Sequence, residues 1–400
     1  MSIILSDAGL HKHLLPLTFT RPVAQLRPGV LRLSEGWYVR SGLPVGYRTE
    51  PYLSEAFRLP AEAADFEVDG SLFPTEDLVA AVMDLRAGEV LVKDGRALAF
   101  GVQAQAIPSE VDWTTPPAYL KRIEFVGELI RFERPWQVFQ QCGRAIALDH
   151  ALLTAGRRSQ ALSSLNTVIG DPQHIFLEEG AVVEGCTLNT RGGPIYIGRN
   201  AEVMEGSLIR GPFALGDHAQ VKMGAKIYGP SSFGPECRVG GEVNNSVLLG
   251  FSNKGHDGFL GNSVLGEWCN LGADTNNSNL KNTYGNVKVF SYASGFDEDS
   301  GLQFCGLIMG DHAKSGINTM FNTGTVVGVA ANVFGGGFQP KRIPGFSWGG
   351  AEGIVVHDVE RALGTARLVM ERRHVQLTAL DEAILRQVFA QEQAGTKVPH

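Results

Sequence analysis

The stretch IGRNAEVMEGSLIRGPFALGDHAQVKMGAKIYGPSSFGPECRVG, from Ile197 to Gly240, carries a hydrophobic side chain at every sixth position. The eight positions are Ile197, Val203, Ile209, Leu215, Val221, Ile227, Phe233 and Val239. Several are followed directly by glycine. An α-helix would repeat its hydrophobic residues about every 3.6 positions, and a half-buried strand about every two. A period of six with apolar–glycine pairs predicts a parallel β-helix of hexapeptide repeats.

Each hexapeptide of such a fold forms one flat face of a triangular prism, and its apolar side chain points inward. Three faces complete a coil of about 18 residues. The period slips after Val239 and again through NNSNLKNTYGNVKVF. It resumes at Phe259, Leu265, Leu271 and Met309. Because slips in a repeat mark insertions on one face, often the binding face, we predict a left-handed β-helix over residues 163–345 with a cleft beside residues 250–279.

A different composition flanks the repeats. Residues 1–162 combine the strand candidates SIILS and EVLVKD with the helix candidate EDLVAAVMDLRAG, which predicts a compact, mixed α/β domain. The segment from Arg134 to Arg158 predicts a helix that links this domain to the β-helix. Residues 346–400 contain VERALGTARLVMERRH and TALDEAILRQVFAQEQ, which we expect to form helices. They would cap the repeat end, since an open edge recruits other chains.

The composition limits the class of protein. Of 400 residues, 44% are hydrophobic and 19% charged, as in globular proteins. The 49 glycines exceed the usual share of about 7% and indicate many tight turns. A net charge of −7 without a basic block argues against a nucleic-acid partner. The sequence shows neither a signal-peptide pattern nor an apolar run of about 18 residues, so no membrane partner is expected.

The cysteines indicate a cytoplasmic protein. Five of them are scattered along the chain without a CxxC pair, which favours reduced thiols over disulfides or a metal cluster. The His-Asp neighbours in HDG and GDH have no spaced partners either, so we expect no dedicated structural metal.

The combination resembles a family of bacterial sugar-nucleotide enzymes, the bifunctional N-acetylglucosamine-1-phosphate uridyltransferases and glucosamine-1-phosphate acetyltransferases, in a compact variant. The resemblance is carried by GPIYIG, EGSLIRGPF, MGAKIYG, SNKGHDGFLGNSVLGEWCNLGADTNNSN and FNTGTVVG. It implies a transferase of UDP-N-acetylglucosamine biosynthesis that acts on a hexose 1-phosphate, with a nucleoside triphosphate and acetyl-CoA as co-substrates. It also implies a homotrimer, because acyltransferases with this β-helix have their sites between neighbouring prisms.

The resemblance implies roles for particular residues of the β-helix. His256, in NKGH, stands at the position of the family's general base, which takes a proton from the sugar 2-amino group as that nitrogen attacks the acetyl thioester. Asn270, in WCNLGA, and Asn279 match asparagines that line the same cleft. Arg342, in KRIP, resembles an arginine that meets the coenzyme A phosphates, although a plain surface position is an open alternative.

The sequence also departs from the family in this cleft. EVNN places Asn244 where relatives have a phosphate-binding lysine, and Phe259 and Leu280 replace two tyrosines. Positive charge for a sugar phosphate must then come from other residues. The candidates are Lys222, Lys226 and Lys254. These departures leave the sugar, and acetyl transfer itself, open.

The N-terminal segment LSDAGLHKHLLPLTFTRPVAQLRPG resembles the opening of sugar nucleotidyltransferases, GxGTRxxPLTxxxPKP. In that motif a glycine backbone cradles the nucleotide phosphates. Only DAG remains of the glycine loop, whereas LPLTFTRP is kept. The resemblance implies nucleotide binding by Lys12, Arg21 and Arg27. Asp7 and Asp69 are the candidate carboxylates for Mg²⁺, the expected cofactor of nucleotidyl transfer.

Two other functions stay open at this level. The chain can be a non-catalytic assembly or regulatory protein on a degenerate transferase scaffold, which the reduced glycine loop and Asn244 favour. The polar cluster around His256 argues against a bare scaffold, because unpaired polar groups in a repeat wall are costly. A third reading keeps one activity and loses the other.

Overall fold

The computed structural model describes residues 1–102 and 111–395, and these residues form two compact units. The N-terminal unit contains residues 1–14, 20–26 and 31–134. The β-helix unit contains residues 15–19, 27–30 and the chain from 135 onward. Two helices that the sequence places near the end of the first domain, α3 (Gln137–Gln140) and α4 (Cys142–Thr154), therefore group with the β-helix.

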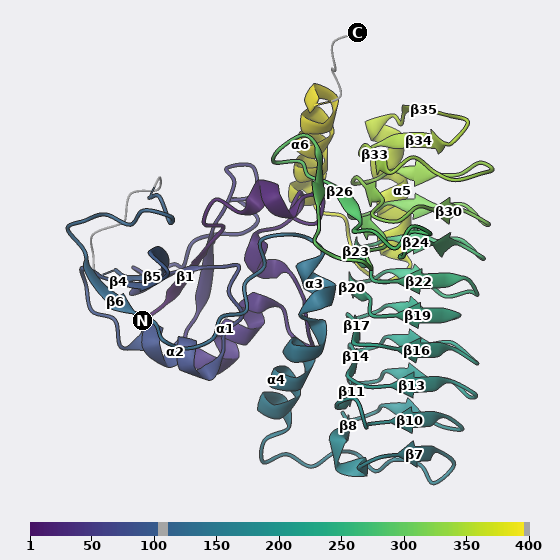
Figure 1. Ribbon diagram of the computed structural model, residues 1–400, viewed down its shortest axis with the longest axis horizontal. Coiled ribbons are helices and arrows are strands. Elements are labelled where there is room, and N and C mark those ends of the chain that lie inside the picture. Colours follow the sequence, from purple (N-terminus) through teal and green to yellow (C-terminus); the bar gives the residue numbers. More distant parts are fainter. Residues whose placement is uncertain (103–110, 396–400) are drawn as a thin grey trace. The chain divides into compact units, whose positions relative to one another are not determined.

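The N-terminal unit is built on one mixed six-stranded sheet (Figure 1). Strand β1 pairs in parallel with β2 and β3, β4 pairs in parallel with β6, and β5 runs antiparallel to both β3 and β4. All residues of β1 and β3 are buried, as expected for central strands. In sheet order the strands are β2 (Val45–Arg48), β1 (Ile3–Ser6), β3 (Phe66–Asp69), β5 (Arg96–Gly101), β4 (Glu89–Lys93) and β6 (Lys121–Glu124).

Short helices complete this unit. The α-helices are α1 (Leu33–Ser41) and α2 (Glu76–Met83), and the 3-10 turns are η1 (His11–Leu14) and η2 (Val23–Gln25). Helix α2 begins where Thr75 accepts a hydrogen bond from the backbone of Leu78, the usual N-cap arrangement. The α/β class predicted for this part of the chain is confirmed.

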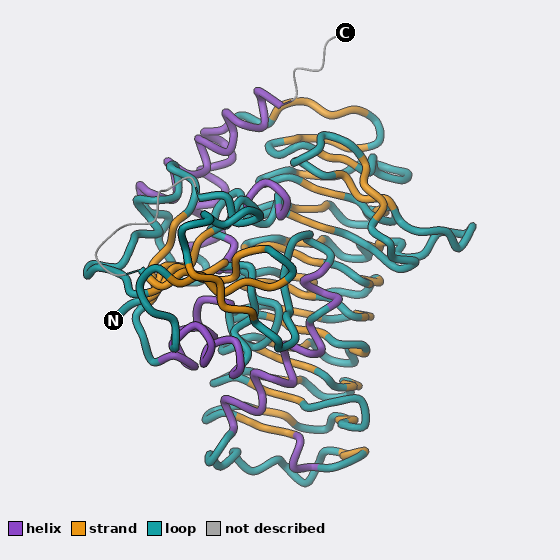
Figure 2. The backbone as a smooth tube through the Cα atoms, turned by 60° about the vertical axis from the view of Figure 1, so that its left-hand side comes forward, coloured by secondary structure: helices purple, strands orange, loops and turns teal. Residues whose placement is uncertain are grey.

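The β-helix unit stacks three parallel sheets, one for each face of the prism (Figures 1 and 2). The first sheet holds β7 (Thr167–Ile169), β10 (Thr187–Asn189), β13 (Leu208–Arg210), β16 (Lys226–Tyr228), β19 (Glu242–Asn244) and β22 (Phe259–Gly261). The pair β25 (Asn276–Asn277) and β30 (Met320–Phe321) lies above it, and β25 contacts β22.

The second sheet begins just after the 3-10 turn η3 (Pro172–His174). Its strands are β8 (Ile175–Leu177), β11 (Ile195–Ile197), β14 (Phe213–Leu215), β17 (Ser231–Phe233), β20 (Val247–Gly250), β23 (Val264–Glu267), β28 (Ile308–Met309), β31 (Val326–Val327) and β33 (Arg342–Ile343). Helix α4 packs on this sheet at β14 and β17.

The third sheet is the longest of the three. Its strands are β9 (Val182–Val183), β12 (Glu202–Val203), β15 (Gln220–Val221), β18 (Arg238–Val239), β21 (Asn253–Lys254), β24 (Asn270–Leu271), β29 (Lys314–Ser315), β32 (Asn332–Val333), β34 (Ser347–Gly350) and β35 (Gly353–Val356). The antiparallel hairpin of β34 and β35 ends the stack.

The six-residue period correctly identifies the core of the β-helix. All eight residues from Ile197 to Val239 are at most 2% exposed and belong to one hydrophobic cluster. Burying each such side chain contributes about 1.5–3 kcal/mol, so the column as a whole is a principal source of stability. The parallel β-helix with C-terminal helices, predicted from the sequence, is confirmed.

The register after the first slip differs from the sequence prediction by one residue. Leu260, not Phe259, is buried and pairs in register with Val243. The coils shorten here, since Ser232 pairs with Val247 and Val247 with Val264. A fixed step of six therefore fails. The core position between Val239 and Leu271 on the third sheet is occupied by Lys254.

The second slip is an insertion. It contains the antiparallel hairpin of β26 (Lys288–Phe290) and β27 (Asp297–Asp299). Just after this hairpin's first strand, Tyr292 donates a 3.0 Å hydrogen bond to Glu392 of helix α6 (Ala379–Gly395). Helix α6 in turn packs on α5 (Val359–Glu371).

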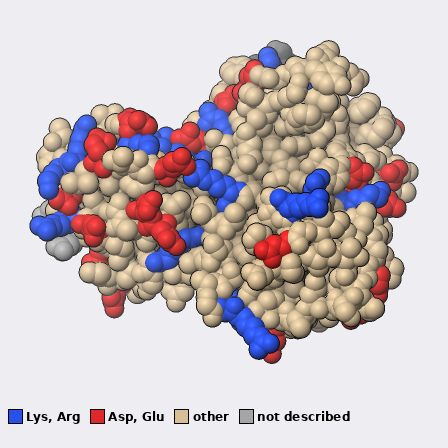
Figure 3. All heavy atoms as spheres, turned by 60° about the horizontal axis from the view of Figure 1, so that its bottom comes forward, with Lys and Arg blue, Asp and Glu red and all other residues tan. Residues whose placement is uncertain are grey.

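No helix within residues 1–102 and 111–395 is long and apolar enough to cross a membrane. On the face drawn in Figure 3, lysine and arginine are interspersed with aspartate and glutamate.

Candidate functional site

His256 lies in an exposed turn where the chain passes from β21 on the third sheet to β22 on the first. The turn is close to the coil below it. A Cβ added to Gly241, whose φ is +69°, would lie 2.7 Å from the carbonyl oxygen of His256. On the other side, the backbone N–H of Asp274 donates to the carbonyl of Asp257 at 3.0 Å. The backbone of the turn is therefore held between two coils, and its imidazole faces solvent.

Lys254, predicted to bind substrate, lies under this turn instead. Its side chain is 2% exposed and occupies a core position of the β-helix. Its Nζ donates to the carbonyl oxygens of Gly240 at 3.2 Å and of His256 at 2.5 Å. Burial lowers the pKa of Lys254 to about 8, although Asp257 and Asp274 oppose the shift. The ammonium group thus fastens the His256 turn to the coil below.

The asparagines that follow His256 bond mainly to neighbouring coils. Asn277 is 4% exposed, accepts from the backbone N–H of Gly261 at 2.8 Å and donates to its carbonyl at 3.0 Å. Asn276 accepts from the N–H of Phe259 at 2.8 Å. Asn279 donates to the side chain of Asn262 at 2.8 Å. These amides continue the first sheet across the second slip, so part of this polar stretch is structural.

A cavity of about 380 Å³ lies on the outer face of the third sheet, against the end of helix α5. Its floor carries Asn253 and Asn270 from successive coils, and Lys314 from the next. Arg372 and Arg373, just after α5, form its wall. We call this space the α5 cavity. Among the predicted site residues, it contains Asn270.

Two aromatic residues line the corner of the α5 cavity. The rings of Phe251 and Trp268 stack with their centroids 4.2 Å apart and an interplanar angle of 18°. Both residues have positive φ, 53° and 63°, which bulky side chains rarely adopt. The corner positions of the coils below, His218 and Glu236, also have positive φ, so the conformation belongs to this edge of the prism. The stack continues to the next coil, where the ring of His312 lies 6.2 Å from that of Trp268 at an interplanar angle of 11°.

Positive charge accumulates around the α5 cavity. Arg373 donates to Asn253 at 3.0 Å and lies 3.8 Å from Glu236, which also pairs with Arg238. Burial, and then repulsion from Arg238, lower the pKa of Arg373. Burial lowers the pKa of Lys314 to about 8. The three cationic side chains on the lining, Lys314, Arg372 and Arg373, therefore favour an anion over a further cation.

The remaining predicted residues of the β-helix are dispersed. Lys222 donates to Gln220 at 2.7 Å, and its pKa is lowered by burial and by Arg238. Lys226 is exposed on the first sheet. Arg342 lies on the second sheet with its guanidinium over the ring of Phe290 at 4.0 Å. The structure thus places Lys226 and Arg342 on other faces than Asn270.

In the N-terminal unit, Asp7 holds the remnant of the glycine loop together. Its carboxylate accepts from the backbone N–H of Val23 at 2.7 Å and from the hydroxyl of Thr49 at 2.5 Å. The ring of His11 lies 3.3 Å away. Lys12 is exposed and Arg21 is buried. Both Asp7 oxygens have protein partners, which makes the carboxylate a structural clamp.

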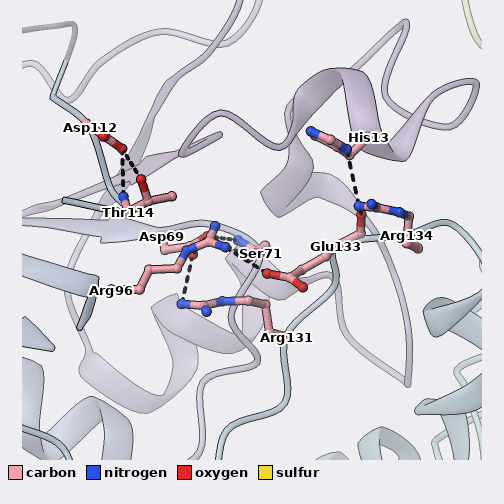
Figure 4. A network of polar contacts seen from close by, with 9 residues as sticks. All are labelled: His13, Asp69, Ser71, Arg96, Asp112, Thr114, Arg131, Glu133 and Arg134. Carbon is pink, nitrogen blue, oxygen red and sulfur yellow. Dashed lines mark hydrogen bonds and ion pairs between the residues drawn. The ribbon is translucent and has the colours of Figure 1, made fainter. Parts of the chain in front are cut away.

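Arg27 and Asp69 are also engaged with the protein. Arg27, which belongs to the β-helix unit, donates to the carbonyl of Val30 at 2.5 Å. Asp69 is fully buried and accepts from the N–H and hydroxyl of Ser71 at 2.9 and 2.6 Å. Arg131 and Arg96 lie 3.3 and 3.8 Å from its other oxygen (Figure 4). Burial raises the pKa of Asp69, although Arg131 and Ser71 oppose the shift.

The expected Mg²⁺ does not fit the carboxylates that the sequence suggested. Within the described ranges, no three histidine, cysteine or acidic side chains converge as metal ligands. Asp7 and Asp69 are each occupied by hydrogen bonds and ion pairs inside the unit. Within the described ranges, Asp7 and Asp69 are therefore not a preformed pair of metal ligands.

Sequence reasoning missed most of the α5 cavity. Phe251, Arg372 and Arg373 belong to no quoted motif, and Trp268 stands in WCNLGA without having been assigned a role. The two arginines are about a hundred residues along the chain from Asn253 and Asn270. A pair of adjacent arginines at the end of a helix was the available signal.

Comparison with known proteins supports the identity of the first domain. Residues 3–158 match the family model described as sugar nucleotidyl transferase. The bifunctional protein GlmU of Methanocaldococcus jannaschii is 33% identical over 87 residues, 22% of this chain and 21% of that protein. A bifunctional sugar-1-phosphate nucleotidylyltransferase/acetyltransferase of Sulfurisphaera tokodaii is 34% identical over 95 residues, 24% of this chain and 23% of that protein. The matches thus span about a quarter of these relatives or less.

The solved structures that match include an acetyltransferase and an acyltransferase. The polysialic-acid-specific acetyltransferase NeuO is 12% identical with a TM-score of 0.28, over 51% of this chain and 98% of that one. The UDP-N-acetylglucosamine acyltransferase of Arabidopsis is 12% identical with a TM-score of 0.20, over 59% and 90% of the two chains. By the family match and its own sheet topology, the chain joins a nucleotidyltransferase-like domain to a parallel β-helix.

Proposed function

We propose that this protein is a transferase of sugar-nucleotide biosynthesis that acts on hexose 1-phosphates. One observation carries the proposal. A domain matching the sugar nucleotidyl transferase model is followed in the same chain by a hexapeptide β-helix. The Sulfurisphaera relative joins nucleotidyl and acetyl transfer in its name.

The β-helix supplies acetyl transfer in this proposal. The 2-amino group of glucosamine 1-phosphate attacks the thioester carbonyl of acetyl-CoA, so a C–N bond forms and the C–S bond breaks. The imidazole of His256 accepts the proton that the nitrogen loses and returns it to the departing thiolate. Its exposure to solvent and the fixed backbone of its turn support this role.

Acetyl transfer is tested by replacing His256 with alanine. The thiol released from acetyl-CoA is measured with glucosamine 1-phosphate as acceptor. We expect activity in the native protein and a loss of about 100-fold or more in His256→Ala, the usual contribution of a general base. The control is His174→Ala, an exposed histidine on a distant coil. Unchanged activity in His256→Ala would refute the assigned mechanism.

Nucleotidyl transfer is the second proposed activity, and the family match at residues 3–158 favours it. Lys12 and Arg21 are the cations of the N-terminal unit that we propose contact the nucleotide. The assay supplies a hexose 1-phosphate, UTP or dTTP, and Mg²⁺, and measures the released pyrophosphate. Product here alone would assign catalysis to the N-terminal unit and assembly to the β-helix. If neither assay gave product, the non-catalytic scaffold would be favoured.

The proposal also includes self-association into a homotrimer. Helix α4 packs on the second sheet and α5 borders the third. The first sheet exposes hydrophobic side chains, among them Leu208, which is 52% exposed. A second and a third copy of the chain are the partners that we propose for this face.

A further inference from the structure

We propose that the α5 cavity is the binding site of a phosphorylated sugar, with its phosphoryl group against Arg372 and Lys314 and its hydroxyl groups against Asn253 and Asn270. The choice of a sugar rests on the proposed function, whereas the assignment of the cavity rests on its own geometry. The cavity, of about 380 Å³, is within the range of small-ligand pockets.

The phosphoryl end is defined by the cations. Arg373 is already engaged by Asn253 and Glu236 and serves as a fixed part of the wall. Arg372 is exposed beside it and has a planar fork of donors suited to phosphate oxygens. Lys314 donates to the carbonyl of His312 at 2.7 Å, which leaves further N–H groups on the same ammonium. Three cationic side chains on one lining make an anion the favoured occupant.

The sugar end is defined by amides and rings. Asn253 and Asn270 lie side by side on adjacent coils, 3.4 Å between the Nδ2 of the first and the Oδ1 of the second. Amides both donate and accept, which suits hydroxyl groups that do the same. The stacked rings of Phe251 and Trp268 supply an apolar wall for the C–H face of a sugar ring. The polar floor, the aromatic corner and the cationic side chains of the cavity together match a phosphorylated sugar better than a simple anion.

The cavity also has a direct chain connection to the proposed catalytic turn. Asn253 and Lys254 are consecutive residues of β21, with Asn253 facing the cavity and Lys254 buried beneath the turn. His256 follows two residues later. A ligand that orders Asn253 therefore acts on the strand that leads into the His256 turn.

Binding is tested by calorimetric titration of the full-length protein with three probes: glucosamine 1-phosphate, glucosamine and inorganic phosphate. We expect glucosamine 1-phosphate to bind most tightly, phosphate more weakly, and glucosamine weakest. Arg372→Ala should raise the Kd of glucosamine 1-phosphate roughly tenfold or more, because a charge-assisted hydrogen bond is lost. Arg361→Ala, an exposed arginine of the same helix outside the cavity, should leave the Kd unchanged.

A second variant tests the sugar end. Asn270→Ala should weaken glucosamine 1-phosphate while leaving inorganic phosphate unaffected. Equal affinities of both ligands in the native protein would reduce the cavity to an anion site and overturn the sugar assignment. Unchanged binding in Arg372→Ala would overturn the cavity itself.

Measuring binding and acetyl transfer in the same variants distinguishes an error in the cavity assignment from an error in the proposed function. His256→Ala should abolish acetyl transfer yet keep the native Kd for glucosamine 1-phosphate. Binding lost in Arg372→Ala without any catalytic turnover in the native protein would support the cavity and refute the acetyltransferase. Acetyl transfer that is unaffected in Arg372→Ala at a low concentration of glucosamine 1-phosphate would support the acetyltransferase and overturn the cavity assignment.

Discussion

At the scale of the residue, Lys254 shows why a charged side chain stands in a hydrophobic column. Its neighbours in that column, Val239 and Leu271, are apolar and buried. The shortened coils bring the carbonyls of Gly240 and His256 to one place, where an ammonium group satisfies both. An unsatisfied buried carbonyl costs about 1–3 kcal/mol, so the lysine solves a local backbone problem.

Lys254 should give the protein a characteristic pH dependence. Its pKa is about 8 in the folded state, against 10.5 ordinarily. Between these values the unfolded chain binds a proton that the folded chain does not, so the free energy of unfolding should rise with pH, by on the order of 3 kcal/mol. Lys254→Met should lack this rise.

The measurement is urea unfolding at several pH values from 7.5 to 10.5, compared between the native protein and Lys254→Met. Lys226→Met serves as control, because Lys226 is exposed. Other titrating groups cancel in the difference. Parallel stability curves for native protein and Lys254→Met would contradict the burial of a perturbed lysine.

At the scale of the element, the first sheet continues through side chains where its backbone pairing stops. β22 is followed by β25, and the connection between them is made by the amides of Asn276 and Asn277. Because side-chain amides take the place of backbone pairing here, the chain can leave the stack after Asn279 and return at Cys305. The N–H of Cys305 donates to the carbonyl of Asn279 at 2.9 Å. The long insertion is thereby accommodated without opening the prism.

Asn277→Ala should destabilise the β-helix. It removes two hydrogen bonds to Gly261 and leaves both its N–H and its carbonyl buried without that partner. The expected loss is about 2–4 kcal/mol in the free energy of unfolding, measured by chemical denaturation. Asn282→Ala, an exposed asparagine of the insertion, should change it by less than about 0.5 kcal/mol. Equal stabilities of the two variants would mean that the amide ladder contributes nothing.

At the scale of the whole molecule, the two compact units have separate hydrophobic cores. Within the β-helix unit, helices border the second and third sheets, whereas the first sheet has a shallow apolar groove lined by Ile169, Leu208 and Tyr228 among others. Exposed apolar surface of this kind marks sites of association.

The proposed trimer therefore depends on the first sheet. Light scattering coupled to size-exclusion chromatography should give three times the mass of one chain. Leu208→Glu should shift the protein toward the monomer, because it places a charge in the proposed interface. Val182→Glu, a half-exposed position on the third sheet, is the control. A monomeric native protein would refute the trimer.

The β-helix could be predicted from the sequence alone, because a six-residue period is a local consequence of how one prism face is built. Ile197 and Val239 could be assigned to the core from spacing alone. The same reasoning placed Phe259 in the core wrongly, because the coils become shorter there. The register of this segment is set by its pairing with the neighbouring coil and not by its own sequence.

The α5 cavity, by contrast, could be found only in the folded chain. From the sequence, Lys254 is a plausible ligand-binding lysine. Its burial and its hydrogen bond to Gly240 show that its side chain points into the β-helix. Arg373 reaches Asn253 across 120 residues of chain. The local sequence pattern indicates which face of an element is apolar. A cavity depends on which distant side chains are brought together by packing, and that is a property of the folded chain alone.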